Sequence, residues 1–367
     1  MSDDPIRGWL AAVLRGDAAA AAPGRQLDAS AVLAAASEEG VPALLHACLS
    51  RPELAQSMPP ALHQPLARAA RVRAAQHMFR EHQCRLILAE IAAPGVPVLL
   101  LKGSALAYQI YPSAHLRECS DIDLLLPSRQ AVARAVAILG TLGYAPRDAA
   151  APGDLVAFEV TCVRSGTERA GLEIDLHWQL SSTPAFAFRY AWAELDASAI
   201  ALPALAPDAR GLAPVPAYLH ACMHRVQNMA GGIGDRLKWL YDLHLLGQHF
   251  GTDDWQALAD QAGARGLAGT CLAGLDAAAR CFGGIAPGSV RRDLATAARG
   301  ETLDPHRMHR WLYIQRMNFL AFPTCAQRMR WLRQRLLPDQ AYLRARHGDA
   351  GLLRLLLRRL RAGIGRL

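Results

Sequence analysis

The sequence predicts an α+β fold, in which a small mixed β-sheet is flanked by helices, preceded by a helical segment and followed by a helical domain. Three observations predict it. Apolar residues recur at helical spacing through most of the first ninety residues and again beyond about residue 215. Between these regions, short apolar runs alternate with acidic residues, which is typical of strands. At 367 residues, the chain is long enough for two packed units.

The first helical pattern spans 31–49, and a longer one follows Pro65 and spans 66–91. The sequence APGVP at 93–97 ends this pattern, so residues 1–92 are expected to form a helical segment that packs on the core. VLLL then predicts a short buried strand near 97–101. Gly103 and Ser104 follow at the position where a helix needs its N-cap.

The second expected strand is DIDLLL, near 121–126, and a helix capped by Ser128 follows it. Two further strands, near 155–163 and 172–178, are expected to form an antiparallel pair. These elements place the core at 93–200. A Pro- and Ala-rich linker at 201–216 then separates it from a helical C-terminal domain at 217–367.

The positive charge of the chain is concentrated at its C-terminal end. The net charge is +8, and residues 328–367 contain eleven arginines against Asp339 and Asp349, which gives this tail +9 and the rest about −1. Such a tail is a candidate for contact with a polyanion, namely RNA, an acidic membrane surface or an acidic protein. The alternative is a solvated helix face.

Two further features concern the compartment. No apolar run approaches the ~20 residues that span a bilayer, and the acidic start MSDDPIRGWL lacks the features of a signal peptide, so no transmembrane segment and a cytoplasmic location are expected. The cysteines are scattered without a CxxC pair, which favours buried reduced thiols over a zinc or redox site. They are Cys48, Cys84, Cys119, Cys162, Cys222, Cys271, Cys281 and Cys325.

The acidic residues of the expected strands alternate with apolar ones. Asp121 and Asp123 therefore point to the same face, about 7 Å apart. In GLEIDLHW the same alternation places Glu173, Asp175 and His177 on one face, so a third carboxylate joins the first two if the strands are neighbours. Grouped carboxylates repel each other unless a proton or a cation, commonly a divalent metal, neutralises them. The alternative is an ordinary solubilising acidic segment.

Lys102, Gly103 and Ser104 lie at the turn from the first strand into a helix. Free backbone N–H groups and the helix dipole make such a turn an anion site, and the lysine adds a positive charge. An anion site, a carboxylate pair and a third carboxylate together indicate a centre for metal-assisted phosphoryl or nucleotidyl transfer.

The stretch from VLLLKGSALAYQIY through SDIDLLLP to LEIDLHW resembles the polymerase-beta-like nucleotidyltransferase superfamily. Its continuation into paired histidines and RLKWLYDLHLL is similar to a bacterial family of uncharacterised nucleotidyltransferases. The resemblance implies that Asp121, Asp123 and Asp175 are catalytic and bind two Mg²⁺ ions, and that Gly103 and Ser104 bind the phosphates of an NTP. It also implies transfer of a nucleoside monophosphate, with release of pyrophosphate, to an unidentified small molecule, peptide or RNA.

Several other charged or polar residues each have a candidate role in the site and an alternative structural role. Lys102 and Arg117 are candidates for neutralising phosphate charge, although Arg117 is equally suited to holding an aspartate. The candidates for the wall of the cleft, against the alternative of a salt-bridged or core position, are His177, Asp235, Lys238 and Asp242. His220 and His224 share a helix face, where packing is favoured over metal binding because no glutamate stands beside the first histidine.

Two other functions use the same residues. The first alternative is a nucleotide-binding scaffold or sensor without catalysis, and the second is a metal-dependent phosphohydrolase that needs no acceptor. The intact set of three acids favours the transferase. Mutual repulsion of these acids further predicts that Asp123→Asn leaves the metal-free fold as stable as the wild type, or slightly more stable.

Overall fold

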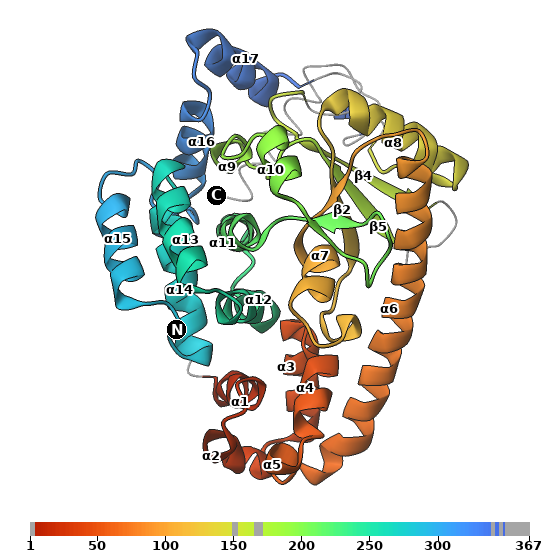
Figure 1. Cartoon of the computed structure of the whole chain (residues 1–367), viewed down its shortest axis with the longest axis vertical. Coiled ribbons are helices and arrows are strands. Elements are labelled where there is room, and N and C mark those ends of the chain that lie inside the picture. The colour runs from red at the N-terminus through yellow and green to blue at the C-terminus, as the bar shows by residue number, and fades with distance from the viewer. Residues whose placement is uncertain (1–3, 149–152, 165–171, 339–341, 345–347, 349–367) are drawn as a thin grey trace.

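The computed structural model describes residues 4–148, 153–164, 172–338, 342–344 and 348. The N-terminal region is helical, as predicted, and α6 runs from the N-terminal helices along one side of the molecule to the sheet (Figure 1). Its helices are α1 (Pro5–Leu14), α2 (Ala18–Ala21), α3 (Ala29–Glu39), α4 (Pro42–Leu49), α5 (Pro52–Ala55) and α6 (His63–Ala92). The pattern predicted over 31–49 divides into α3 and α4 at Gly40, whose φ of 71° ends α3 in a left-handed cap.

The sheet is mixed and has the order β3-β4-β5-β2-β1-β7-β6. β2 pairs with β5 and β1 with β7 in parallel, whereas the other neighbouring strands are antiparallel. The strands are β1 (Leu99–Leu100), β2 (Asp121–Leu125), β3 (Tyr144–Pro146), β4 (Glu159–Arg164), β5 (Glu173–His177), β6 (Ile200–Ala201) and β7 (Arg210–Gly211). The predicted α+β class and the antiparallel pairing of β4 with β5 are confirmed.

The segment 201–216, predicted as a linker, contains sheet structure instead. β6 and β7 form a hairpin within and just before it, and Gly211 of β7 is the register partner of Leu100 in β1. A Cβ at Gly211 would come 2.6 Å from Nε2 of Gln109 and 3.2 Å from Cβ of Ala105, so glycine permits this close contact with α7. The linker prediction is therefore wrong, because the sheet extends to Gly211. The division of the chain into domains stays a prediction.

Two helices of the core begin close to their predicted positions. α8 (Arg129–Thr141) is capped by Ser128, whose side chain accepts a hydrogen bond from the backbone N–H of Ala131, as predicted. α7 (Lys102–Gln109) begins one residue before Gly103, and Leu101 takes the N-cap position without a side-chain hydrogen bond. Gly103 and Ser104 consequently lie in the first turn of α7 rather than at its cap.

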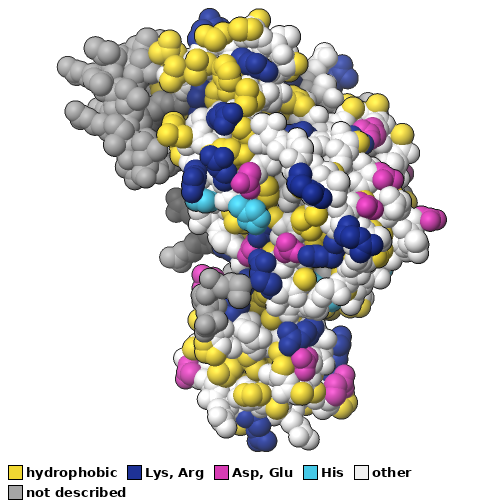
Figure 2. All heavy atoms as spheres, turned by 90° about the vertical axis from the view of Figure 1, so that its left-hand side faces the viewer, with side chains coloured by type: hydrophobic (Ala, Val, Ile, Leu, Met, Phe, Trp, Pro, Cys, Tyr) yellow, Lys and Arg dark blue, Asp and Glu magenta, His cyan; other side chains and the backbone are white. Residues whose placement is uncertain are grey.

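The chain beyond the sheet is helical, and α1 packs against α14 in this part. The helices that flank the sheet or follow it are α9 (Pro184–Ala187), α10 (Trp192–Ser198), α11 (Pro214–Ala230), α12 (Leu237–Gln248), α13 (Thr252–Ala264), α14 (Ala268–Phe282), α15 (Gly288–Ala298), α16 (Trp311–Leu320) and α17 (Cys325–Leu336). Apolar side chains gather on the surface at the end of the molecule that carries α16 and α17 (Figure 2). In the part of the chain that is described, no helix is long and apolar enough to cross a membrane.

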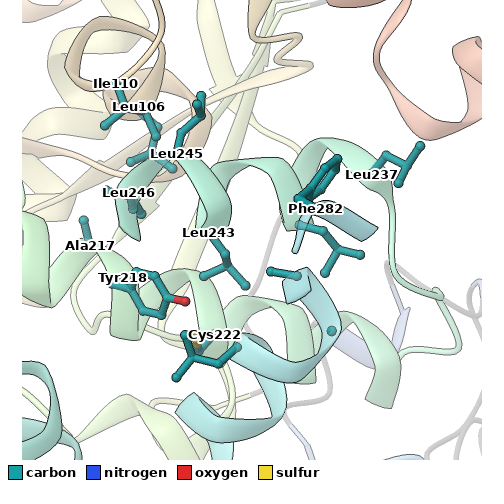
Figure 3. Close-up of a cluster of buried hydrophobic side chains, with 14 of the residues drawn as sticks. Leu106, Ile110, Ala217, Tyr218, Cys222, Leu237, Leu243, Leu245, Leu246 and Phe282 are labelled. Atoms are coloured by element: carbon teal, nitrogen blue, oxygen red, sulfur yellow. The ribbon is translucent and has the colours of Figure 1, made fainter. Parts of the chain in front are cut away.

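The buried side chains form two main clusters on opposite faces of the sheet. One cluster lies between the sheet, α6 and α8 and includes Ile122, Leu124, Ile174 and Leu176. The other joins α7 to the C-terminal helices: Figure 3 shows Leu106 of α7 and Ile110, which follows α7, together with side chains of α11, α12 and α14. The position of α7 is thus fixed by apolar packing against the helical region.

Five of the eight cysteines are buried, as predicted, and all eight are free. Cys119 and Cys281 are half-buried and Cys325 is exposed, so the expectation of burial is wrong for Cys325. The basic tail lies largely outside the described residues. Of its eleven arginines, the described ones are Arg328, Arg330, Arg333, Arg335 and Arg344.

Candidate active site

The acidic cluster is built by the register of two parallel strands. Asp123 of β2 is the register partner of Asp175 of β5, and Asp121 is the partner of Glu173. Side chains alternate along each strand, so these carboxylates share one face of the sheet while the intervening apolar residues are buried under α6 and α8. The predicted adjacency of the third acid to the first two is confirmed.

Asp123 is the most buried acid of this cluster, with 2 % of its surface exposed. Its Oδ1 lies 2.6 Å from Nζ of Lys102 and 3.1 Å from Nε2 of His177. Burial alone acts to raise the pKa of Asp123, but the ammonium and the imidazole outweigh it and hold this pKa well below its usual range. Asp123 is therefore ionised at neutral pH, and Lys102 is its main counter-charge.

Asp175 and Asp121 are less well neutralised. The hydroxyl of Thr161 donates a 2.6 Å hydrogen bond to Oδ1 of Asp175, but burial and the charge of Asp123 leave the pKa of Asp175 raised. Burial and Asp123 likewise raise the pKa of Asp121, against the attraction of Lys102. Among the described residues, neither Asp121 nor Asp175 is in an ion pair. The cluster thus has a surplus of negative charge, which a bound cation would neutralise.

Asp123, Asp175 and His177 form the metal-compatible group of the described residues, since one ligand atom from each lies within 4.8 Å of the others. His177 is 2 % exposed, and its Nδ1 lies 3.2 Å from Oε2 of Glu159. Asp121 is on the same face of β2 but is not part of this group. The sequence places His177 on the acidic face, yet its role there was predicted only as part of a cleft wall.

The turn from β1 into α7 lies directly beside the acids. The backbone N–H of Leu101 donates to the carbonyl of Asp123 over 3.0 Å, and the hydroxyl of Ser104 donates to the carbonyl of Asp121 over 3.2 Å. The backbone of Lys102 is left-handed, with a φ of 51°. Among the described residues, Lys102 is the non-glycine residue with a positive φ. Such strain is typical of functional sites, and here it brings the ammonium to Asp123.

Gly103 is required by close packing beneath this turn. A Cβ added to Gly103 would lie 2.6 Å from Sγ of Cys119 and 3.2 Å from Cζ of Arg117. The first turn of α7 therefore rests on the segment that precedes β2. The assignment of Lys102, Gly103 and Ser104 to nucleotide phosphates stays a prediction, and their position at a helix N-terminus next to the acids supports it.

Arg117 forms a buried ion pair with an aspartate. Its Nε and Nη2 donate to Oδ1 and Oδ2 of Asp242, each over 2.7 Å, and the hydroxyl of Tyr111 donates to the same Oδ1 over 2.8 Å. Arg117 is 5 % exposed and Asp242 is 3 % exposed. Both arms of the guanidinium are used, so this geometry does not support the nucleotide-binding assignment of Arg117. The alternative, that Arg117 holds an aspartate, describes its contacts.

The other candidate wall residues lie around α12. Asp235 forms a two-pronged ion pair with Arg225, at 2.6 and 2.7 Å, which agrees with the salt-bridged alternative. Burial lowers the pKa of Lys238, and the nearby Arg117 lowers it further. Asp242 borders a small cavity together with Lys102 and other residues of α7, α11 and α12. Lys102 thus touches both the acids and this cavity.

His220 and His224 line the same cavity. Burial lowers the pKa of His220 to about 3 and that of His224 well below its usual value, and the charge of Lys102 acts in the same direction on both. Both imidazoles are therefore neutral at physiological pH. Neither belongs to the metal-compatible group of the described residues, in keeping with a packing role.

The model of a protein family described as uncharacterised nucleotidyltransferase matches residues 25–283, which contain the acidic cluster, the α7 turn and α12. The chain belongs to this family and is an enzyme of the nucleotidyltransferase type. No curated protein and no solved structure matches it.

Proposed function

We propose that the enzyme transfers a nucleoside monophosphate from an NTP to an acceptor, releases pyrophosphate and depends on divalent metal ions. The observation that carries the proposal is the group of buried Asp123 and half-buried Asp175 with surplus negative charge, beside a strained lysine at the start of α7. The metal ions that accompany a nucleotide would place positive charge on such a group, and the phosphates of the nucleotide suit the helix N-terminus.

In this proposal, Asp121, Asp123 and Asp175 hold the metal, and Lys102, Gly103 and Ser104 bind the phosphates. The family resemblance implies two divalent ions, and Mg²⁺ is the expected metal. When bound, these ions would neutralise negative charge at the reacting phosphate. The acceptor oxygen forms a bond to the α-phosphorus, and the bond between this phosphorus and the oxygen bridging to the β-phosphate breaks. Pyrophosphate leaves with that oxygen.

Asp175 is the acid that we assign to the acceptor's proton. Thr161 occupies Oδ1 of Asp175, so Oδ2 is left to take a proton from the attacking hydroxyl. A carboxylate beside the acceptor hydroxyl is a candidate general base. Asp123, whose pKa is lowered, is suited to remain a charged ligand throughout.

The proposal is tested by incubating the enzyme with each α-³²P-labelled NTP, Mg²⁺ or Mn²⁺ and candidate acceptors. Pyrophosphate release together with label on the acceptor supports transfer. Release of free nucleoside monophosphate or inorganic phosphate without an acceptor supports the phosphohydrolase instead. Nucleotide binding without turnover in any combination supports the scaffold or sensor and contradicts the proposal.

The basic tail is a separate proposal, in which residues 328–367 contact a polyanion and take no part in the chemistry. The net charge of +9 in this segment supports it. Deleting residues 340–367 should weaken binding to RNA or to anionic vesicles and reduce its dependence on salt concentration. If binding and its salt dependence stay the same, the arginines are a solvated surface.

A further inference from the structure

His177 lies between two carboxylates at the centre of the acidic face. Its Nε2 is 3.1 Å from Oδ1 of Asp123, and its Nδ1 is 3.2 Å from Oε2 of Glu159. The side chain is 2 % exposed, and Nδ1 lacks a hydrogen bond of good geometry. A buried imidazole whose two nitrogens both face carboxylates has a polar environment that packing alone does not require.

We infer that His177 is a metal ligand together with Asp123 and Asp175, and that its nitrogen makes the site prefer a first-row transition-metal ion over Mg²⁺. The inference deepens the proposed function, on which its catalytic meaning rests. It differs from the carboxylate-only set implied by the family resemblance. Imidazole suits transition metals, whereas Mg²⁺ prefers oxygen ligands and keeps much of its water.

The distances fit a single ion. Ligand atoms of Asp123, Asp175 and His177 all lie within 4.8 Å of one another. Bonds of about 2.1 Å place the ligands of one ion roughly 3 to 4 Å apart. The 3.1 Å between Nε2 of His177 and Oδ1 of Asp123 lies within this range, so little movement is needed to bring the three ligands to one ion.

The neighbouring strand holds two of the three ligands in place. In the register of β4 with β5, Glu159 is the partner of His177 and Thr161 is the partner of Asp175. Thr161 donates to Asp175 over 2.6 Å, and a small rotation of the His177 ring would let Nδ1–H donate to Glu159. Metal-binding histidines commonly donate their second ring N–H to a carboxylate, which fixes the tautomer that leaves the other nitrogen free.

Lys102 occupies the place of the cation in the metal-free protein. Its ammonium lies 2.6 Å from the same oxygen of Asp123 that His177 approaches. A metal ion bound through this oxygen would compete with Lys102 for it. Lys102 lies in the first turn of α7, where the nucleotide phosphates are proposed to bind, so its ammonium would remain beside them.

The test uses Mn²⁺ as the probe, without nucleotide. Mn²⁺ binding is titrated by the loss of its free electron paramagnetic resonance signal, and electron spin echo envelope modulation of the bound ion detects coordinated ¹⁴N. We expect imidazole ¹⁴N modulation in the wild type and tighter binding of Mn²⁺ than of Mg²⁺. His177→Gln should lose the modulation, weaken Mn²⁺ binding about 100-fold and narrow the difference between the two metals.

Three further variants sharpen the result. Glu159→Gln should weaken Mn²⁺ binding about tenfold and keep the modulation, since it removes only the partner of Nδ1. His220→Gln should keep the modulation, which assigns the nitrogen to His177. His82→Gln, on the exposed surface of α6, should leave Mn²⁺ binding unchanged.

Absence of ¹⁴N modulation in wild-type protein with bound Mn²⁺ overturns the inference, and this result does not depend on the folding of any variant. His177 then only hydrogen-bonds to Asp123, and the carboxylate site of the proposed function survives. If instead Mn²⁺ binds as tightly to Asp123→Asn and Asp175→Asn as to the wild type, the metal centre itself is wrong. The two failures are therefore distinct.

Discussion

Two buried aspartates of this enzyme have opposite surroundings. Asp242 receives two guanidinium N–H groups from Arg117 and the hydroxyl of Tyr111, so its charge is fully matched. Asp123 is buried to the same degree and is paired with Lys102 and His177. It also has two further acids beside it, Asp121 and Asp175, whose pKa values are raised.

The difference separates a structural ion pair from a ligand site. A buried pair that is complete needs no further charge, and removing one partner leaves the other uncompensated. A buried group with surplus negative charge is costly to the protein, and the cost is relieved when a cation binds. The Arg117–Asp242 pair therefore joins the segment before β2 to α12, whereas the acidic cluster is where we propose that the chemistry takes place.

The largest expected effect is on the acidic cluster. Asp175→Asn keeps an oxygen that can accept the hydrogen bond from Thr161, but it removes a metal ligand and the assigned base. Transfer activity should fall about a thousandfold or more. The metal-free protein should be at least as stable as the wild type, because the raised pKa of Asp175 marks an unfavourable charge. Radiolabel transfer and thermal melts in a chelator measure the two quantities.

The matched control is Asp208→Asn, a substitution in an exposed turn, which should change neither quantity. A lower melting temperature for metal-free Asp175→Asn, with activity retained, would make Asp175 a structural residue. For Asp123→Asn the structure reverses the expectation drawn from the sequence. Asp123 is favourably paired with Lys102, so its loss should lower the stability of the metal-free protein.

The second prediction concerns the complete pair. Asp242→Asn leaves the guanidinium of Arg117 buried without a counter-charge and should lower the free energy of unfolding by about 3–5 kcal/mol. Tyr111→Phe removes one hydrogen bond from the same aspartate and should cost about 1 kcal/mol. Urea denaturation measures both. Equal stability of Asp242→Asn and the wild type would mean that water or another group solvates Arg117.

These contrasts show what the sequence could predict. The alternation of acids with apolar residues located β2 and β5 within about a residue of their observed ends, because strand periodicity is a local signal. It also placed Asp121, Asp123 and Asp175 on one face. The short strands β6 and β7 were missed, since two residues carry no periodicity and a Pro- and Ala-rich sequence is typical of a linker.

The contacts that distinguish the two aspartates could not be predicted, because they join distant parts of the chain. Arg117 and Asp242 are 125 residues apart, and nothing near either residue indicates the other. The approach of His177 to Asp123 depends on the register of β2 with β5, which the pattern of each strand leaves open. Residue type and face were therefore predictable, whereas partners were not.

The third prediction concerns the cation that Lys102 provides. Lys102→Met removes the charge that competes with a metal for Asp123, so Mn²⁺ should bind about tenfold more tightly in the absence of nucleotide, which corresponds to about 1.4 kcal/mol. Nucleotide binding should weaken at the same time, because the phosphates lose a positive partner. Electron paramagnetic resonance titration measures the first effect.

Lys238→Met is the control for this substitution. Lys238 contributes weakly to the electrostatics of Asp121 and forms no ion pair with Asp123 among the described residues, so its removal should change Mn²⁺ affinity much less. Unchanged Mn²⁺ affinity in Lys102→Met would show that metal and lysine do not share the carboxylate. Lys102 would then be a permanent partner of Asp123, as Arg117 is of Asp242.

The smallest effect is the pH dependence of stability in metal-free protein. The pKa of Asp175 is raised by burial and by Asp123, so the folded state holds a proton on Asp175 more tightly than the unfolded state. This contribution to stability is fully present below the ordinary pKa of an aspartate and is lost as the pH rises through the raised value. The lowered pKa of Asp123 acts in the opposite sense and removes stability only as the pH falls below the ordinary pKa of an aspartate.

The stability of the wild type relative to Asp175→Asn should therefore decrease as the pH rises from about 4 toward neutrality. Paired thermal melts in a chelator across this range measure the difference. A difference that is constant with pH, or that increases, would show that Asp175 is fully compensated like Asp242, and the surplus charge that distinguishes the two regions would be confined to Asp121.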